Sequence, residues 1–230
     1  MANNATHDKR LLILTGPQGS GNHLFSRIFS MHPLVNGWEA LKERYWVPSD
    51  QEPFAEYWVY PERFDPVTVM AQGEYFLANV SAPFFYDGVR QFPRIADVAL
   101  KSQAAGIAVT VAIVCRDYGI NFEQQKRVGG EATIVDAMTH YRALISVMKA
   151  NSIPVHFVSH ESLFMWQQNY VEYLARTLDF PVDLQNWNHQ LNQSPNLKYV
   201  QAVDHHWLDD TIRAGRRPFA ERIIERLKEK

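Results

Sequence analysis

The chain has 230 residues, of which 46% are hydrophobic and 21% are charged, as in an ordinary soluble globular protein. Its 23 basic and 25 acidic side chains give a formal net charge of -2. That balance argues against a nucleic-acid-binding protein and against a polybasic protein that docks on membranes. We therefore expect any anion site to be local, and the length favours one domain over residues 1–230.

The sequence lacks the signals of membrane insertion and secretion. No apolar run approaches the roughly 18 residues of a membrane-spanning helix, and the start, MANNATHDKR, lacks the apolar core of a secretion signal. We expect a cytoplasmic protein without a membrane partner. Cys115 is the only cysteine. Its place in the apolar run VTVAIVC favours a buried, unreactive thiol.

Strand and helix patterns alternate along the chain. Short apolar runs rich in β-branched residues predict strands, and apolar residues at helical spacing predict helices. The alternation favours a three-layer α/β sandwich with a central parallel sheet and helices on both faces. The predicted strands are 11–14, 75–80, 107–115 and 153–159, and the predicted helices are 22–31, 95–105, 132–150, 162–178 and 220–227.

Residues 45–75 interrupt this alternation. Their tyrosines, tryptophans, phenylalanines and prolines follow no clean period. We interpret the segment as an irregular, aromatic-rich insertion outside the core, which would serve as a lid or as the wall of a substrate pocket. Ordinary packing of the rings is an equally good explanation.

The sequence TGPQGSGN joins the first predicted strand to the first predicted helix. At such a junction, unpaired backbone N–H groups and the positive end of the helix dipole attract anions. Gly16, Gly19 and Gly21 would let the backbone curl around an oxyanion, and so many glycines exceed what a tight turn needs. The loop predicts an anion site, with a plain turn as the alternative.

The stretch GPQGSGNH has the spacing of the Walker A motif, but Asn22 and His23 occupy the positions of its Lys and its Ser or Thr. Without the lysine, the charge on the β- and γ-phosphates is not neutralised. Without the hydroxyl, Mg²⁺ loses a protein ligand. Ordinary ATP-dependent phosphoryl transfer is therefore poorly supported.

Three segments together resemble the sulfotransferase family. In LLILTGPQGSGNHLFSRIFSMHP (11–33), SGNHL takes the place of the family's Ser-Gly-Thr-Thr-Leu. IAVTVAIVCRDYGINFEQQKR (107–127) is similar to the family's strand that ends in an arginine, and IPVHFVSHESL (153–163) to its strand that ends in Tyr-Glu-Asp-Leu. The resemblance implies a fold like that of P-loop NTPases, with 3′-phosphoadenylyl sulfate (PAPS) as co-substrate and no metal.

The resemblance also implies which residues bind the nucleotide. Arg116 would hold the 3′-phosphate, and Gln124 stands where the family usually has a serine eight residues after the arginine. Arg213 and Gly215, in RAGRRPF, would close over the nucleotide. The family's Lys or Arg before Ser-Gly is missing, so His23, Arg27 or another arginine would supply that charge. The residues predicted to contact the 5′-phosphosulfate are Gln18, Gly19, Ser20, Gly21, Asn22 and His23.

Elementary chemistry supports part of this assignment. Arg116 directly follows a buried strand, at the sheet edge where open α/β proteins bind ligands. A surface arginine paired with Asp117 is the alternative. In 153–163, we expect His160 to be structural and Glu161 to hydrogen-bond a neighbouring loop.

Sulfuryl transfer to a hydroxyl also needs a base. His23 in the loop and Glu39 beside Trp38 are the catalytic candidates, because several sulfotransferases that act on carbohydrates have a glutamate base at a position like that of Glu39. A solvated glutamate is an equally good explanation for Glu39. The pair His205 and His206 lacks a third ligand at proper spacing, so we expect no metal site.

The sequence thus predicts a PAPS-dependent sulfotransferase that acts on a hydroxyl of a saccharide or small molecule. It predicts no nucleic-acid partner. The alternatives are a nucleotide or small-molecule kinase with a degenerate Walker A loop, and a non-catalytic nucleotide-binding protein.

Overall fold

The computed structural model describes residues 9–39, 49–129 and 132–188. The predicted helix 220–227, the nucleotide contacts predicted for Arg213 and Gly215, and the pair His205 and His206 lie outside the described residues. The single domain over residues 1–230 stays a prediction.

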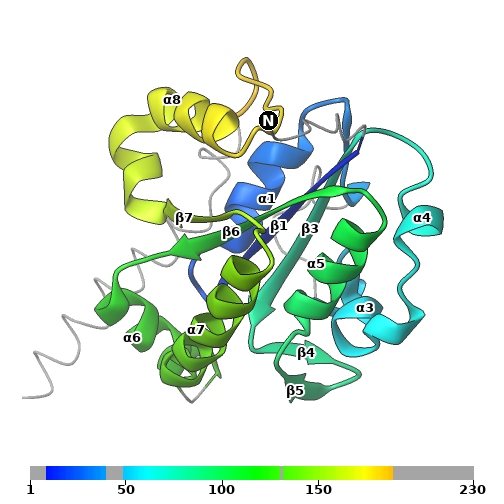
Figure 1. Ribbon diagram of the computed structural model, residues 1–230. Coiled ribbons are helices and arrows are strands. Elements are labelled where there is room, and N and C mark those ends of the chain that lie inside the picture. The colour runs from blue at the N-terminus through cyan, green and yellow to red at the C-terminus, as the bar shows by residue number, and fades with distance from the viewer. Residues whose placement is uncertain (1–8, 40–48, 130–131, 189–230) are drawn as a thin grey trace, which may run out of the picture. The chain divides into compact units, whose positions relative to one another are not determined.

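A parallel sheet forms the centre of the described chain (Figure 1). Its five strands lie in the order β2-β3-β1-β6-β7, and every neighbouring pair is parallel. The predicted α/β class is therefore confirmed. The strands are β1 (Arg10–Pro17), β2 (Val35–Asn36), β3 (Tyr75–Ala82), β6 (Ala108–Cys115) and β7 (Val155–Ser159).

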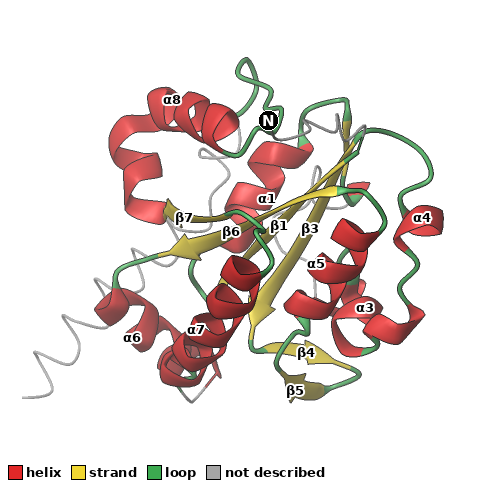
Figure 2. Cartoon of the chain, in the orientation of Figure 1, coloured by secondary structure: helices red, strands yellow, loops and turns green. Residues whose placement is uncertain are grey.

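Helices cover both faces of this sheet, as a three-layer sandwich requires (Figure 2). Successive residues of β1 point to opposite faces, because side chains alternate along a strand. Leu12 and Leu14 pack with α1 and α8, whereas Leu11 and Ile13 pack with α5 and α7. The four helices are α1 (Asn22–Ser30), α5 (Ile95–Ala104), α7 (Ile134–Ala150) and α8 (His160–Thr177).

The described part of the 45–75 segment is built from short helical turns. Trp58, Phe64 and Met70 are buried in the same core as Leu11 and Ile13. The expectation that this segment lies outside the core is therefore wrong for these residues. Each turn is too short for a helical period to appear in the sequence. The turns are η1 (Ser49–Gln51), α3 (Ala55–Val59), η2 (Pro61–Arg63) and α4 (Pro66–Val69).

Four further elements were not predicted: β2, the two strands of the hairpin, β4 (Phe84–Tyr86) and β5 (Val89–Gln91), and α6 (Tyr118–Gly129). The predicted burial of Cys115 is wrong, because β6 ends there and the residue emerges exposed at the sheet edge. Desolvation and the charge of Glu161 nevertheless raise the pKa of its thiol. Among the described residues, no helix is both long enough and apolar enough to cross a bilayer.

The strand order creates a topological switch point at one edge of the sheet. After β1 the chain passes to β2 and β3 on one side, and after β6 it passes to β7 on the other. Because the connections that follow these two adjacent strands diverge, their carboxyl ends form the topological switch point at which open α/β sheets bind ligands.

Candidate functional site

The glycine loop between β1 and α1 occupies this switch point. Gly19 and Gly21 have φ angles of 83° and 103°, which glycine adopts readily and other residues do not. The N–H of Ser20 donates to the carbonyl of Pro17 at 3.0 Å and closes a tight turn. No side chain caps α1, and its first turn contains no acidic residue. The loop therefore presents an uncapped helix end, which favours an anion.

The side chains of Ser20 and Asn22 point into the protein. Ser20 Oγ donates to Asn22 Oδ1 at 2.6 Å. Asn22 Nδ2 lies 3.3 Å from the carbonyl oxygens of Gly16 and Val80 and 3.2 Å from Ser81 Oγ. Asn22, at the Walker lysine position, thus fastens the loop to β3. That Ser20 and Asn22 contact a phosphosulfate stays a prediction, and such a contact would run through their backbone N–H groups.

Arg116 lies against the same loop. Its Nη1 donates to the carbonyl of Gly19 at 3.1 Å and to Gln124 Oε1 at 2.7 Å. Gln125, the next residue of α6, donates from Nε2 to the carbonyl of Gln18 at 2.9 Å. The structure therefore brings together Arg116, Gln124 and the glycine loop, and Gln124 holds the guanidinium in place.

His160 and Glu161 lie on the other side of the loop. The buried His160 ring covers Gly21, because a Cβ added to this glycine would lie 2.6 Å from His160 Cδ2. Burial, aided by the charge of Arg116, lowers the pKa of His160 to about 4. Glu161 Oε1 accepts a hydrogen bond from the N–H of Asp117 at 2.9 Å, which confirms the predicted role of Glu161.

The His160→Asn variant should lose less stability in acid than the wild type. The unfolded chain binds a proton at this histidine with the ordinary pKa of 6.5, whereas the folded chain binds it only near 4, so acid favours unfolding. Between pH 7 and pH 5, protonation of this histidine in the unfolded chain lowers the free energy of unfolding of the wild type by about 2 kcal/mol. The variant lacks this histidine and so does not show this decrease. Urea unfolding at both pH values measures the difference, and equal losses would contradict the proposed burial of His160.

His23 pairs with a carboxylate that the sequence analysis missed. His23 Nε2 lies 3.0 Å from Glu52 Oε1, and Asn79 Nδ2 of β3 donates to Glu52 Oε2 at 2.5 Å. The Glu52 side chain is only 2% exposed. Burial raises the pKa of Glu52 well above its ordinary value and lowers that of His23 to about 4, so His23 is neutral at pH 7.

One sequence signal pointed toward this network. Asn79 interrupts the apolar run YFLANV, and a polar side chain buried in a strand needs a partner. That signal predicts a polar contact but does not identify Glu52 as the partner.

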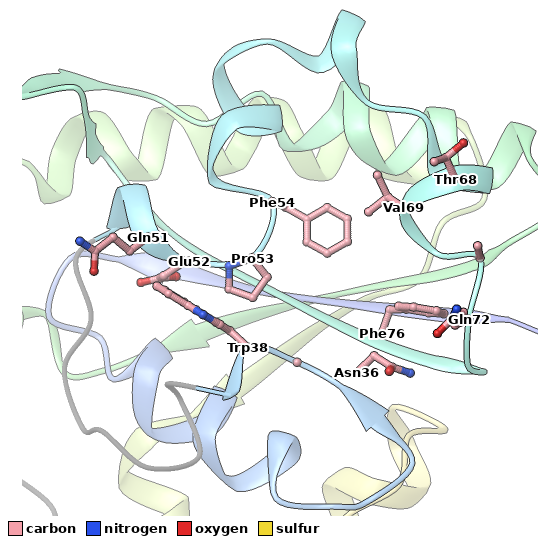
Figure 3. A pocket seen from close by; sticks show the side chains of 12 residues that line it. Asn36, Trp38, Gln51, Glu52, Pro53, Phe54, Thr68, Val69, Gln72 and Phe76 are labelled. Carbon is pink, nitrogen blue, oxygen red and sulfur yellow. The ribbon is translucent and has the colours of Figure 1, made fainter.

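A cavity of about 670 Å³ adjoins this network, and Glu52 and Trp38 lie at one end of it (Figure 3). Glu39 is exposed and is not among the residues that line the cavity. A catalytic role for Glu39 therefore stays a prediction.

The described residues contain no group of three His, Cys, Asp or Glu side chains that could hold a metal ion. No protein-family model matches the chain, and no curated protein matches it.

Proposed function

We propose that the protein is a PAPS-dependent sulfotransferase with a P-loop-like nucleotide site, and that it transfers a sulfuryl group to a hydroxyl of a carbohydrate or small-molecule acceptor. The observation that carries the proposal is the contact of Arg116 with Gly19 at the switch point of the sheet. This contact places the Arg116 guanidinium beside the uncapped end of α1, and both groups favour a phosphorylated ligand. The cytoplasmic location remains part of the proposal.

A second polar group beside the loop supports nucleotide binding. Asn121 of α6 is buried, and its Oδ1 has no hydrogen-bond partner among the described residues. This atom lies 3.0 Å from the position of a Cβ added to Gly19. Because a buried amide oxygen without a partner is costly, a bound ligand that donates a hydrogen bond to it, such as a nucleotide through a hydroxyl or amino group, would stabilise this arrangement.

The environment of Asn22 argues against the kinase alternative. Its amide group is occupied by bonds to Gly16, Val80 and Ser81, and it carries no charge for the β- and γ-phosphates. His23, in place of the Mg²⁺-binding hydroxyl, faces Glu52. A donor that reacts without a protein-bound Mg²⁺ fits these side chains better than ATP does.

The transfer that we propose balances as a single displacement. The acceptor oxygen forms a bond to sulfur, the bond from sulfur to the 5′-phosphate oxygen breaks, and 3′,5′-ADP leaves. Glu52 takes the proton of the acceptor hydroxyl. His23 and Asn79 position its carboxylate, and burial raises the pKa of Glu52, which makes the carboxylate a stronger base than an exposed one.

Thermal unfolding with 3′,5′-ADP tests the nucleotide site. A ligand at 100 times its Kd stabilises the folded state by about 2.7 kcal/mol, so the melting temperature should rise by several degrees. Arg116→Ala should abolish most of this rise. Arg63→Ala, which removes an exposed arginine paired with Glu56, should retain it.

The other outcomes of this experiment are equally informative. Stabilisation by ATP with Mg²⁺ alone would support the kinase instead. No rise with 3′,5′-ADP, or an equal rise in the wild type and Arg116→Ala, would overturn the proposal.

A further inference from the structure

The cavity beside Glu52 is formed by segments far apart in the sequence. One wall comes from β2 and the residues that follow it, and the others come from η1, the turn before α3, α4 and the start of β3. Its volume of about 670 Å³ is typical of small-molecule sites. The lining residues are Asn36, Gly37, Trp38, Gln51, Glu52, Pro53, Phe54, Thr68, Val69, Ala71, Gln72 and Phe76.

Aromatic rings supply the apolar part of this lining. Trp38, Phe54 and Phe76 come from three different segments, and Figure 3 shows them distributed along the cavity. Aromatic faces stack on flat apolar surfaces, including the C–H face of a pyranose ring. The rings therefore favour a ligand with at least one flat, apolar face.

Amides and a hydroxyl supply most of the polar part. The side chains of Asn36, Gln51 and Gln72 each carry both donors and an acceptor, and Thr68 adds a hydroxyl group. Such groups match ligand hydroxyls, which also donate and accept. Asn36 Nδ2 already donates to the carbonyl of Tyr75 at 3.2 Å, which orients its amide.

The charged side chains of the cavity lining limit which ligands the cavity can bind. Among the described lining residues none is Lys, Arg, His or Asp, so an anionic ligand would meet no cation. Glu52 is the only carboxylate, and it is already bonded to His23 and Asn79. An anionic ligand would therefore lose its hydration without gaining a partner of opposite charge, and a cationic ligand would have to compete with His23 and Asn79 for Glu52.

We infer that this cavity is the acceptor site and that it binds an uncharged, polyhydroxylated ring compound with the chemistry of a neutral saccharide. The ring lies against Trp38, and one hydroxyl reaches Glu52 at the same end of the cavity. The catalytic part of this inference rests on the proposed function, whereas the binding part does not.

Ligand-observed NMR with defined probes tests the binding part. The probes are the methyl glycosides of glucose, galactose, mannose and xylose, with methyl glucuronide and glucosamine as charged counterparts. At least one neutral glycoside should bind at millimolar concentration, and more tightly than either charged probe. Trp38→Ala and Gln72→Ala should each weaken binding by about tenfold.

Matched variants outside the cavity provide the control. Trp166→Ala removes an exposed tryptophan of α8, and Gln168→Ala removes an exposed glutamine that donates to Glu172. Both should bind the glycoside as the wild type does.

Three results would overturn the inference: no binding of any neutral glycoside, tighter binding of a charged probe, or binding that Trp38→Ala leaves unchanged. The thermal rise with 3′,5′-ADP is a separate readout. A rise without glycoside binding removes only the acceptor class, and glycoside binding without a rise removes only the proposed nucleotide site.

Discussion

Glu52→Gln is expected to lower the rate of sulfuryl transfer by about 100-fold or more, because removal of a general base typically costs this much. Glutamine keeps the size and the hydrogen-bonding atoms of a protonated glutamate, so the contacts with His23 and Asn79 can persist. However, glutamine cannot take the proton of the sulfuryl-accepting hydroxyl. The release of 3′,5′-ADP from PAPS, in the presence of the neutral methyl glycosides, measures the rate.

Two other glutamates make this experiment decisive. Glu62→Gln removes a solvent-facing carboxylate that pairs with Arg94, and it should leave the rate unchanged. Glu39→Gln compares the two candidate bases directly. If Glu39→Gln abolishes transfer while Glu52→Gln does not, the base is Glu39 and our assignment is wrong.

A loss of folding would not explain a slower rate in Glu52→Gln, because we expect this variant to be at least as stable as the wild type at pH 8. The folded chain holds a proton on Glu52 to a higher pH than the unfolded chain does, since burial raises its pKa. As the pH rises between those two pKa values, the wild type loses stability. The glutamine variant does not, so at pH 8 it should be at least as stable as the wild type in urea.

The parts of the fold that the sequence predicted are those with a long hydrophobic period or run. The run IAVTVAIVC predicted β6 to within one residue, and 132–150 predicted α7 almost as closely. The position of Arg116 at the ligand-binding edge of the sheet was also expected, and its contact with the loop fits that position because residues that follow adjacent parallel strands meet at one edge. Local sequence patterns therefore predicted the main strands and helices that surround the site.

The position of Glu52 beside His23 could not be predicted from local sequence patterns. Glu52 follows η1 and precedes α3, two elements with too few residues for a period. Its pairing with His23 depends on how this segment packs over β3, and that tertiary arrangement leaves no repeat in the sequence. Glu39 was the more obvious carboxylate because it closely follows α1, yet proximity in sequence did not place it in the cavity.

Gly16→Ala is expected to destabilise the protein by about 3 kcal/mol, the upper part of the usual range for overpacking. An added Cβ would lie 2.4 Å from Ser20 Oγ, 2.6 Å from Asn22 Oδ1 and 2.6 Å from the backbone carbonyl oxygen of Val114. The carbonyl belongs to β6, an interior strand paired with β1 and β7, and cannot move aside. The two side chains are bonded to each other, so their displacement would break the bonds that fasten the loop to β3. Urea unfolding measures the change.

Gly88→Ala is the matched control for this substitution. Gly88 has a φ of 72°, but an added Cβ there meets nothing within 4 Å. Its replacement should cost only the backbone strain of a left-handed residue, about 1 kcal/mol. The excess cost at Gly16 therefore measures how tightly Ser20, Asn22 and Val114 enclose the base of the loop. If Gly16→Ala costs no more than Gly88→Ala, the loop is not held in the conformation on which the proposed nucleotide site depends.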